Sequence, residues 1–405
     1  MISVGIDVSK GRSTVCILKP GGELIEPPFE MLHNYESINA LIAMINSYNE
    51  ETRVVLEDTG HYHWPVVTVL LDHGVFVTCV NALRMKRFCS QSIRKGKTDK
   101  IDSVKIAQYG ITYWDELTPF TPSGEAYDNL RILSRQYYQY VSLLIKAKIN
   151  YSNIIDRVMP DIKSVISNIT DKQYDIVERY WHFTNIVSMG EKRFISDFCK
   201  WGKKKGYHSN EGKAKQIYSV ASNGIPTLPY NQIAKNIVLE AIKVIRELKR
   251  SRDTILSQMC EIARALPEYS VLTAMHGIGD TLAARFIAET GDVRRFHSKN
   301  AVVAYCGIDA PPYQSGAFTS TNRHISKRGN KYLRRTGFEI MQSFMKQKPT
   351  YDCAVYEYML KKKAEGYPAK YYNIAGLNKF LKIYYARVME LYEEIDYTLV
   401  FSSNI

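Results

Sequence analysis

The sequence predicts a mixed fold: an N-terminal α/β region with a mixed sheet, then a long helical arm and a mostly helical C-terminal region. Short β-prone apolar runs alternate with helical segments over about the first hundred residues. Two later stretches, 123–160 and 233–266, repeat apolar residues three and four positions apart, as long amphipathic helices do. We therefore expect three domains, at residues 1–115, 116–266 and 267–405, with a helical insertion at about 161–230.

The composition supports a folded, nucleic-acid-binding chain. Of 405 residues 45% are hydrophobic, which is enough for a real core in two or three domains. Lys and Arg outnumber Asp and Glu by 54 to 41, a formal charge of +13, so nucleic acid is the natural partner and an anionic membrane surface the second possibility. The 29 tyrosines suit either base stacking or, more commonly, helical interfaces.

The sequence shows no sign of export or membrane insertion. Its first residues lack the charged and apolar regions of a signal peptide, and no apolar run is long enough to span a membrane. The seven cysteines are scattered, odd in number and form no Cys-x-x-Cys pair, so they indicate neither a disulfide framework nor a zinc ribbon. We expect a cytoplasmic protein in a reducing compartment.

The N-terminal region begins with a predicted three-stranded meander, which a further helix–strand alternation follows. Turn residues such as Gly11 and the Pro20-Gly21-Gly22 run separate the first strands. The predicted strands are 2–6, 13–18, 23–29, 53–56 and 75–80, and the predicted helices are 35–48 and 61–73.

Four acidic residues in this region predict a metal site. Asp7 ends the first strand and Glu57 ends the fourth, so the two lie side by side if those strands are neighbours. Asp99 and Asp102 lie three apart in the first turns of a helix that Thr98 caps. Taken alone, each acid is better explained as a turn or cap residue than as a metal ligand. Together they form a plausible two-metal site of the kind that clamps a phosphodiester.

Basic residues flank this predicted site. They precede the acidic helix in two groups, and Lys100 adds to the charge at its start, a place that the helix dipole makes poor for cations. A polyanion partner explains this arrangement, and we expect phosphate contacts. The two groups are Arg84, Lys86 and Arg87, and Arg94, Lys95 and Lys97.

The two long helical stretches suggest an antiparallel coiled-coil arm. Leu130, Leu133 and Tyr137 lie on the apolar stripe of the first, and Ile242 and Ile245 on that of the second, which Pro267 ends. The residues between them are less patterned and include a basic loop at 203–205.

The last third of the chain carries two features that point to DNA. The Gly277-Ile278-Gly279 turn resembles a helix-hairpin-helix, in which backbone amides approach a phosphate, although a simple interhelical turn is about as plausible. A dense basic patch follows at Arg323, Lys327, Arg328, Lys331, Arg334 and Arg335. Ser315 precedes a glycine in a loop beside this patch. A serine there can attack a phosphodiester, but most Ser-Gly pairs are turns, and the residues alone do not select it.

These motifs, taken together, resemble a known family. Asp7 in GIDVSK, Glu57 in LEDTG, the KTDKIDSVKIA segment, and YQSG followed by ISKRGNKYLRR are similar to the DEDD transposases of insertion sequences. These are the Piv-like recombinases, now known as bridge-RNA-guided serine recombinases. The resemblance covers both ends of the chain in the family's order and implies a RuvC-like RNase H fold for residues 1–115.

The resemblance also implies a set of roles. Asp7, Glu57, Asp99 and Asp102 would hold Mg²⁺ or Mn²⁺, and Ser315 would be the nucleophile that joins covalently to cleaved DNA. The partners would be donor and target DNA, a structured guide RNA and further copies of the chain in a dimer or tetramer, with no membrane involved. Ala310 departs from the proline usual in the family and Ser103 from the common alanine. The insertion and the Tyr-rich tail after about Tyr351 make this chain longer than compact members.

Two alternatives remain open from the sequence. One is a non-catalytic nucleic-acid-binding protein on the same scaffold, such as a decayed copy, but a decayed copy should have lost at least one of the five catalytic residues. The other is a junction-resolving, metal-dependent endonuclease that uses only the four acids. Neither alternative needs the serine.

Overall fold

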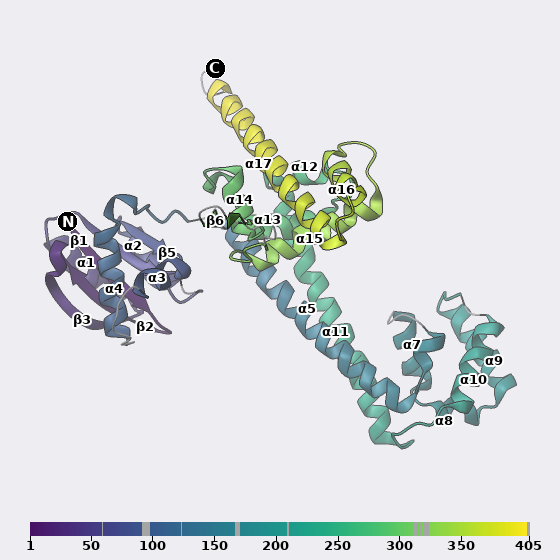
Figure 1. Cartoon of the computed structure of the whole chain (residues 1–405). Coiled ribbons are helices and arrows are strands. Elements are labelled where there is room, and N and C mark those ends of the chain that lie inside the picture. Colours follow the sequence, from purple (N-terminus) through teal and green to yellow (C-terminus); the bar gives the residue numbers. More distant parts are fainter. Residues whose placement is uncertain are drawn as a thin grey trace. The chain divides into compact units, whose positions relative to one another are not determined.

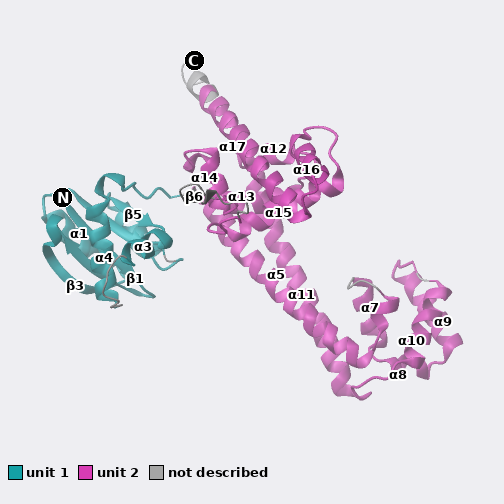
Figure 2. Cartoon of the chain, in the orientation of Figure 1, with its two compact units in different colours: residues 1–122 teal, residues 123–405 magenta. Residues whose placement is uncertain are grey.

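The computed structural model divides into two compact units, residues 1–122 and 123–405 (Figures 1 and 2). It describes residues 1–58, 60–90, 98–122, 124–166, 171–208, 210–310, 314–315, 318–319 and 324–402. The first unit extends to 122, beyond the expected boundary at 115, because the Phe120 N–H donates to the Val77 carbonyl at 2.7 Å and the Phe120 ring meets Trp64 edge-on. The finer division of the remaining chain stays a prediction.

Unit 1 contains a five-stranded mixed sheet in the order β3-β2-β1-β4-β5. The first three strands form the predicted antiparallel meander, while β4 runs parallel to β1 and β5 runs parallel to β4. The strands are β1 (Ile2–Val8), β2 (Arg12–Leu18), β3 (Leu24–Leu32), β4 (Thr52–Glu57) and β5 (Val77–Val80). The first and fourth strands are neighbours, which is the condition under which Asp7 and Glu57 were expected to lie side by side.

Helices cover both faces of this sheet. The even-numbered residues of β1 face α1 (Tyr35–Ser47) and α2 (Trp64–Asp72) in one apolar cluster, since alternate residues of a strand point to opposite faces. The other face packs against α3 (Ala82–Cys89) and α4 (Asp99–Thr112). A short 3₁₀ segment precedes β3 at Pro20–Gly22, and another follows α4 at Trp114–Glu116.

Unit 2 is helical and is organised along two long antiparallel helices, α5 (Glu125–Val158) and α11 (Gln232–Arg264). The chain between them is helical, and its Tyr174, Phe194 and Phe198 lie in an aromatic core that residues of α5 and α11 share. Its helices are α6 (Ile162–Val165), α7 (Asp171–Tyr180), α8 (Phe183–Ser188), α9 (Glu191–Lys204) and α10 (Glu211–Asn223).

The C-terminal helices pack around a second core, which includes Phe286, Phe380 and Tyr384. The elements are α12 (Pro267–Thr273), α13 (Asp280–Thr290), a 3₁₀ segment (Val293–Arg295), α14 (Lys299–Cys306), β6 (Gln314–Ser315), β7 (Phe318–Thr319), α15 (Lys331–Gln347), α16 (Ala354–Ala364) and α17 (Ala369–Ser402). In the described ranges, no helix is long and apolar enough to cross a membrane.

Many tyrosines serve the helical interfaces of unit 2. Tyr151 and Tyr174 are buried in the insertion core, and Tyr127, Tyr138 and Tyr384 are buried in the C-terminal core. These tyrosines therefore pack in helical interfaces, which is the commoner of the two uses considered from the sequence, rather than stack on bases.

Candidate active site

Two of the predicted acids lie at the carboxyl ends of neighbouring parallel strands. In the β1–β4 pair, Gly5 is opposite Val55 and Ile6 is opposite Leu56, so the next residues along are Asp7 and Glu57. Residues in register on parallel strands point to the same face. Both side chains are half-buried on the face that α4 covers.

Helix α4 lies unusually close to β1. A Cβ atom on Gly5 would lie 2.2 Å from the Ala107 nitrogen and 2.4 Å from the Ser103 carbonyl oxygen. One on Gly110 would lie 2.1 Å from the Ser3 hydroxyl oxygen. The helix therefore runs antiparallel to β1, and its first turn lies at the Asp7 end of the strand.

That first turn carries the other two predicted acids. Thr98 caps it as predicted, its hydroxyl oxygen accepting from the Ile101 N–H at 3.2 Å. Asp102 is half-buried, while Asp99 is exposed and lines a neighbouring cleft with Arg12 and Glu30. Asp99 and Asp102 thus differ in exposure, and Asp102 is the one beside the close contact between α4 and β1.

The Cys89 thiol, at the end of α3, is affected by three of the four acids. Burial raises its pKa, Lys105 lowers it, and the charges of Asp102, Glu57 and Asp7 raise it further. Carboxylates from two strands and a helix therefore lie near enough to this thiol to raise its pKa.

The donor chemistry of this site fits a hard divalent cation. Carboxylate oxygens are the ligands that Mg²⁺ and Mn²⁺ prefer. In the described ranges, no group of three or more His, Cys, Asp or Glu residues is already arranged to hold a metal ion. Binding by all four acids therefore stays a prediction.

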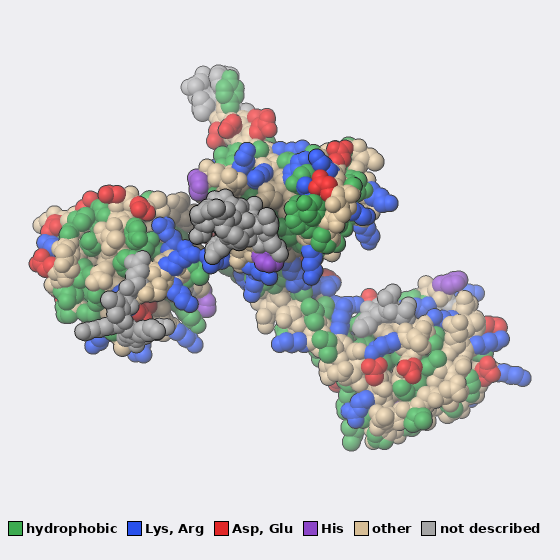
Figure 3. Space-filling view, viewed as in Figure 1, with side chains coloured by type: hydrophobic (Ala, Val, Ile, Leu, Met, Phe, Trp, Pro, Cys, Tyr) green, Lys and Arg blue, Asp and Glu red, His purple; other side chains and the backbone are tan. Residues whose placement is uncertain are grey.

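The predicted basic residues of α3 are exposed beside this site. Met85 anchors the helix in the core, while Arg84, Lys86 and Arg87 lie on its surface (Figure 3 shows Lys and Arg in blue). Arg84 pairs with Glu116 at 3.5 Å. The second predicted group, Arg94, Lys95 and Lys97, lies outside the described residues.

Ser315 lies in a short hairpin rather than in the expected loop. It ends β6 and is opposite Phe318 of β7, because the two strands pair antiparallel. The Gly316 that follows it lies outside the described residues, as do Arg323 and Ser320.

The chain on the two sides of this hairpin is held together by backbone hydrogen bonds. The Lys327 N–H donates to the Gly307 carbonyl at 3.0 Å, and the Asn330 N–H donates to the Tyr305 carbonyl at 2.7 Å. Gly329 packs directly against the backbone of Tyr305, since a Cβ atom on Gly329 would lie 2.3 Å from the Tyr305 carbonyl oxygen.

The predicted basic patch divides into exposed and internally bonded residues. Lys327, Arg328 and Lys331 are exposed. Arg334 donates to the Cys306 carbonyl at 2.8 Å, and Arg335 pairs with Glu339 at 3.0 Å. The first three are thus the better phosphate contacts and Arg334 mainly holds the fold, whereas Arg335 is exposed and pairs with a neighbour on its own helix.

A buried carboxylate that the sequence analysis missed supports this region. Glu289 of α13 is 1% exposed and accepts hydrogen bonds from Ser134 at 2.6 Å, from Arg135 and from Asn330 at 2.8 Å. Asn330 in turn caps α15. The sequence feature that could have identified Glu289 is an acidic residue directly after the apolar run Phe286-Ile287-Ala288. Its partners Asn330 and Ser134, however, are 41 and 155 positions away in sequence.

Solved structures of RuvC show a weak likeness to part of this chain. Two structures of the Thermus thermophilus protein, one in complex with a Holliday junction substrate, are 11% and 12% identical. Each covers 30% of this chain and 100% of its own length with a TM-score of 0.23, which is too low to support an argument.

Sequence comparisons are more informative. Residues 4–160 match the DEDD transposase domain of the IS110 group, and residues 269–356 match the transposase domain of the IS116/IS110/IS902 family. An uncharacterized 44.8 kDa protein of insertion element IS116 from Streptomyces clavuligerus is 23% identical over 368 residues, covering 90% of this chain and 89% of that protein. The chain therefore carries the DEDD and C-terminal transposase domains of the IS110/IS116 family.

Proposed function

We propose that this protein is the transposase of a mobile insertion sequence and cuts and rejoins DNA with a metal-binding DEDD site and a serine nucleophile. One observation carries the metal part of the proposal. The parallel pairing of β1 and β4 brings Asp7 and Glu57 to the same strand ends, and the close packing of α4 brings Asp102 to that end as well.

The four acids Asp7, Glu57, Asp99 and Asp102 would hold Mg²⁺ or Mn²⁺. A divalent ion there supplies positive charge to the oxygens of a phosphodiester. The protein's part would be to hold the carboxylates in place, and the close contact of Gly5 with Ala107 supports this because it leaves no space between β1 and α4. The exposed cations of α3 bind the phosphates on either side.

Ser315 would attack the scissile phosphorus. Its Oγ forms an ester bond with phosphorus, the bond from phosphorus to the leaving strand oxygen breaks, and the hydroxyl proton passes to a base or to the leaving oxygen. Exposed Lys327 and Arg328 would stabilise the charge that develops on phosphate. A structured guide RNA would select donor and target DNA, and a dimer or tetramer would allow the acidic site of one protomer to complete the serine site of another.

The test of the serine is a covalent adduct. Wild-type protein should form a denaturation-resistant protein–DNA adduct that maps to Ser315 by mass spectrometry, and Ser315→Ala should abolish it while DNA and RNA binding remain. Ser320→Ala is the matched control in the same segment. Ser326 is a poor control, because its hydroxyl donates to the Asp309 carboxylate.

The test of the acids is Asp102→Asn, which keeps the side-chain size and removes the charge. Strand transfer in Mg²⁺ should fall to background, while the melting temperature should stay close to that of wild type. Undiminished strand transfer by this variant would contradict the assignment of Asp102 as a metal ligand. DNA cleavage without an adduct would instead favour the endonuclease that uses only the acids, and binding without cleavage would favour the non-catalytic protein.

A further inference from the structure

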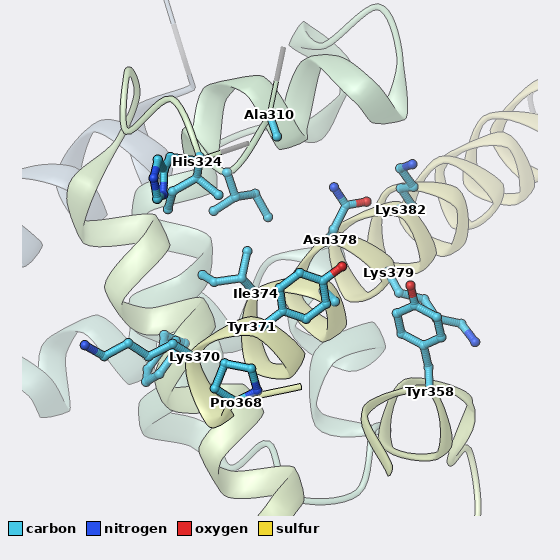
Figure 4. Close-up of a pocket in the computed structure, with 14 residues that line it drawn as sticks. Ala310, His324, Tyr358, Pro368, Lys370, Tyr371, Ile374, Asn378, Lys379 and Lys382 are labelled. Carbon is cyan, nitrogen blue, oxygen red and sulfur yellow. The ribbon is translucent and has the colours of Figure 1, made fainter. Parts of the chain in front are cut away.

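Unit 2 contains a groove that the proposed chemistry does not use (Figure 4). Its volume is about 1100 Å³, and the N-terminal part of α17 forms one side of it. Ligand pockets usually measure about 300–1,000 Å³, so this groove has room for a nucleotide rather than for a single ion.

The groove combines an apolar floor with a basic and aromatic rim. Ile308, Ile325 and Ile374 contribute to the floor. The rim includes Tyr358, Lys370, Tyr371, Asn378, Lys379 and Lys382. Among the described residues that line it there is no Asp or Glu. This surface suits a ligand with a flat apolar part and a negative charge.

Tyr371 is the most informative residue of the groove. Its side chain lies in the middle of the labelled residues in Figure 4 and is 48% exposed. It stacks on Tyr367, with ring centroids 4.1 Å apart and planes inclined by 12°. A tyrosine pair already stacked at the surface offers a flat platform for a base, since every base has a π-face.

The three lysines supply the charge. Lys379 is held in place, because its ammonium donates to the Ala354 carbonyl at 2.9 Å and lies 5.1 Å from the Tyr358 ring centroid. Lys370 and Lys382 have no carboxylate within 4.0 Å in the part of the chain that the structure describes. They therefore retain their charge for a phosphate, the usual partner of such lysines along single strands.

Two residues that line the groove, Ala310 and His324, flank in sequence the segment 311–323 that carries Ser315. We propose that the groove binds an unstacked nucleotide of a single DNA strand, next to the phosphodiester that Ser315 attacks. The choice of DNA rests on the proposed function, in which DNA is the strand that Ser315 cuts.

The experiment measures equilibrium binding of fluorescent oligothymidylate by anisotropy, in EDTA so that no cleavage occurs. We expect Tyr371→Ala to weaken binding about tenfold, the effect of losing one stacked base. Tyr371→Phe should bind as wild type, because the ring remains. Tyr351→Ala is the matched control, since Tyr351 is 60% exposed and does not line the groove.

A second arm tests the lysines and the kind of nucleic acid. Lys382→Gln should weaken binding and Lys361→Gln, from the exposed surface of α16, should not. The proposal is overturned if Tyr371→Ala binds oligothymidylate with the same affinity as Tyr351→Ala. It is also overturned if Tyr371→Ala lowers the affinity for oligouridylate alone, which would make the groove an RNA site. A change in molar mass by light scattering without a change in DNA affinity would also overturn it, in favour of a second copy of the chain.

The same assay separates this proposal from the proposed function. Ser315→Ala should bind oligothymidylate like wild type. If the covalent adduct fails to map to Ser315, the serine assignment fails while the groove result stands; if Tyr371→Ala binds normally, the groove fails while the adduct stands.

Discussion

Gly5 of β1 and Ala107 of α4 are in backbone contact, with no room for a side chain between them. A Cβ atom on Gly5 would lie 2.2 Å from the Ala107 nitrogen and 2.8 Å from its α-carbon. Both neighbours are backbone atoms, so neither can move aside by a change of rotamer. This contact sets the distance between the strand that ends near Asp7 and the helix that begins near Asp102.

We expect Gly5→Ala to displace α4 and to damage the acidic site. Overpacking of this kind usually costs about 1–3 kcal/mol of unfolding free energy, and a backbone clash falls at the upper end. Urea unfolding should show this loss, and strand transfer should fall further than stability alone explains. Gly212→Ala in α10 is the control, because its Cβ would have no neighbour closer than 3.7 Å. Equal stability of the two variants would contradict the packing argument.

Removing the Glu289 carboxylate should destabilise unit 2. Glu289→Ala removes the carboxylate that accepts from Ser134, Arg135 and Asn330, although Asn330 keeps the main-chain carbonyl of residue 289 and the Tyr305 hydroxyl as acceptors. Breaking a buried pair typically costs about 3–5 kcal/mol. The measurement is chemical unfolding of the full chain. Glu261→Ala, from the exposed surface of α11, should change stability by less than about 0.5 kcal/mol. A similar small change in Glu289→Ala would mean that the hydrogen-bond network contributes little.

The exposed cations of α3 should determine part of the salt dependence of DNA binding. Removing one cation that neutralises a phosphate should reduce the log–log slope by about 0.9 for duplex DNA. We expect this from Lys86→Gln and Arg87→Gln, and less from Arg84→Gln, because Arg84 already pairs with Glu116. The control is Lys243→Gln in α11, whose side chain is exposed and near Glu240. An unchanged slope in all variants would show that α3 is a solvated surface.

The same measurement should rank the cations after the serine hairpin. Arg328→Gln and Lys331→Gln should reduce the slope, since both side chains are exposed. Arg334→Gln should mainly lower stability, because it removes the bond to the Cys306 carbonyl. The reverse ranking would contradict the division into exposed and internally bonded residues.

Glu268 should make the stability of unit 2 depend on pH. Burial raises the pKa of this carboxyl above its ordinary 4.5, although hydrogen bonds from Tyr127 and Tyr392 lower it. The folded chain therefore holds the proton more tightly than the unfolded chain. The contribution of Glu268 to the unfolding free energy is complete below pH 4.5 and falls as the pH rises through the folded pKa.

Glu268→Gln tests this sign. The difference in unfolding free energy, wild type minus variant, should decrease from pH 4 towards neutral pH, since Gln has no proton to lose. Glu261→Gln should show no such trend. A difference that increases with pH would mean that the tyrosine hydroxyls stabilise the carboxylate more than burial penalises it.

Local pattern was sufficient for most of the elements. Short apolar, β-prone runs between turn residues predicted the strands of unit 1, and the spacing of Leu130, Leu133 and Tyr137 predicted the helix that α5 forms. Thr98 was predicted to cap α4, and it does. These predictions hold because short apolar runs, helical spacing and helix capping each depend on residues within a few positions of one another.

Other features depend on contacts that no local pattern encodes. The sequence alone identified Asp7, Glu57, Asp99 and Asp102 as candidates, but only the sheet order made Asp7 and Glu57 neighbours, and only the fit of α4 on Gly5 brought Asp102 to them. The sequence also showed a basic patch, but the fold decided that Arg334 is bonded to the Cys306 carbonyl and that Glu289 accepts a hydrogen bond from Asn330, 41 positions away. Hydrogen bonds and close packing between distant segments form only when the whole chain folds, so the tertiary structure alone decides which charges are exposed and which are buried.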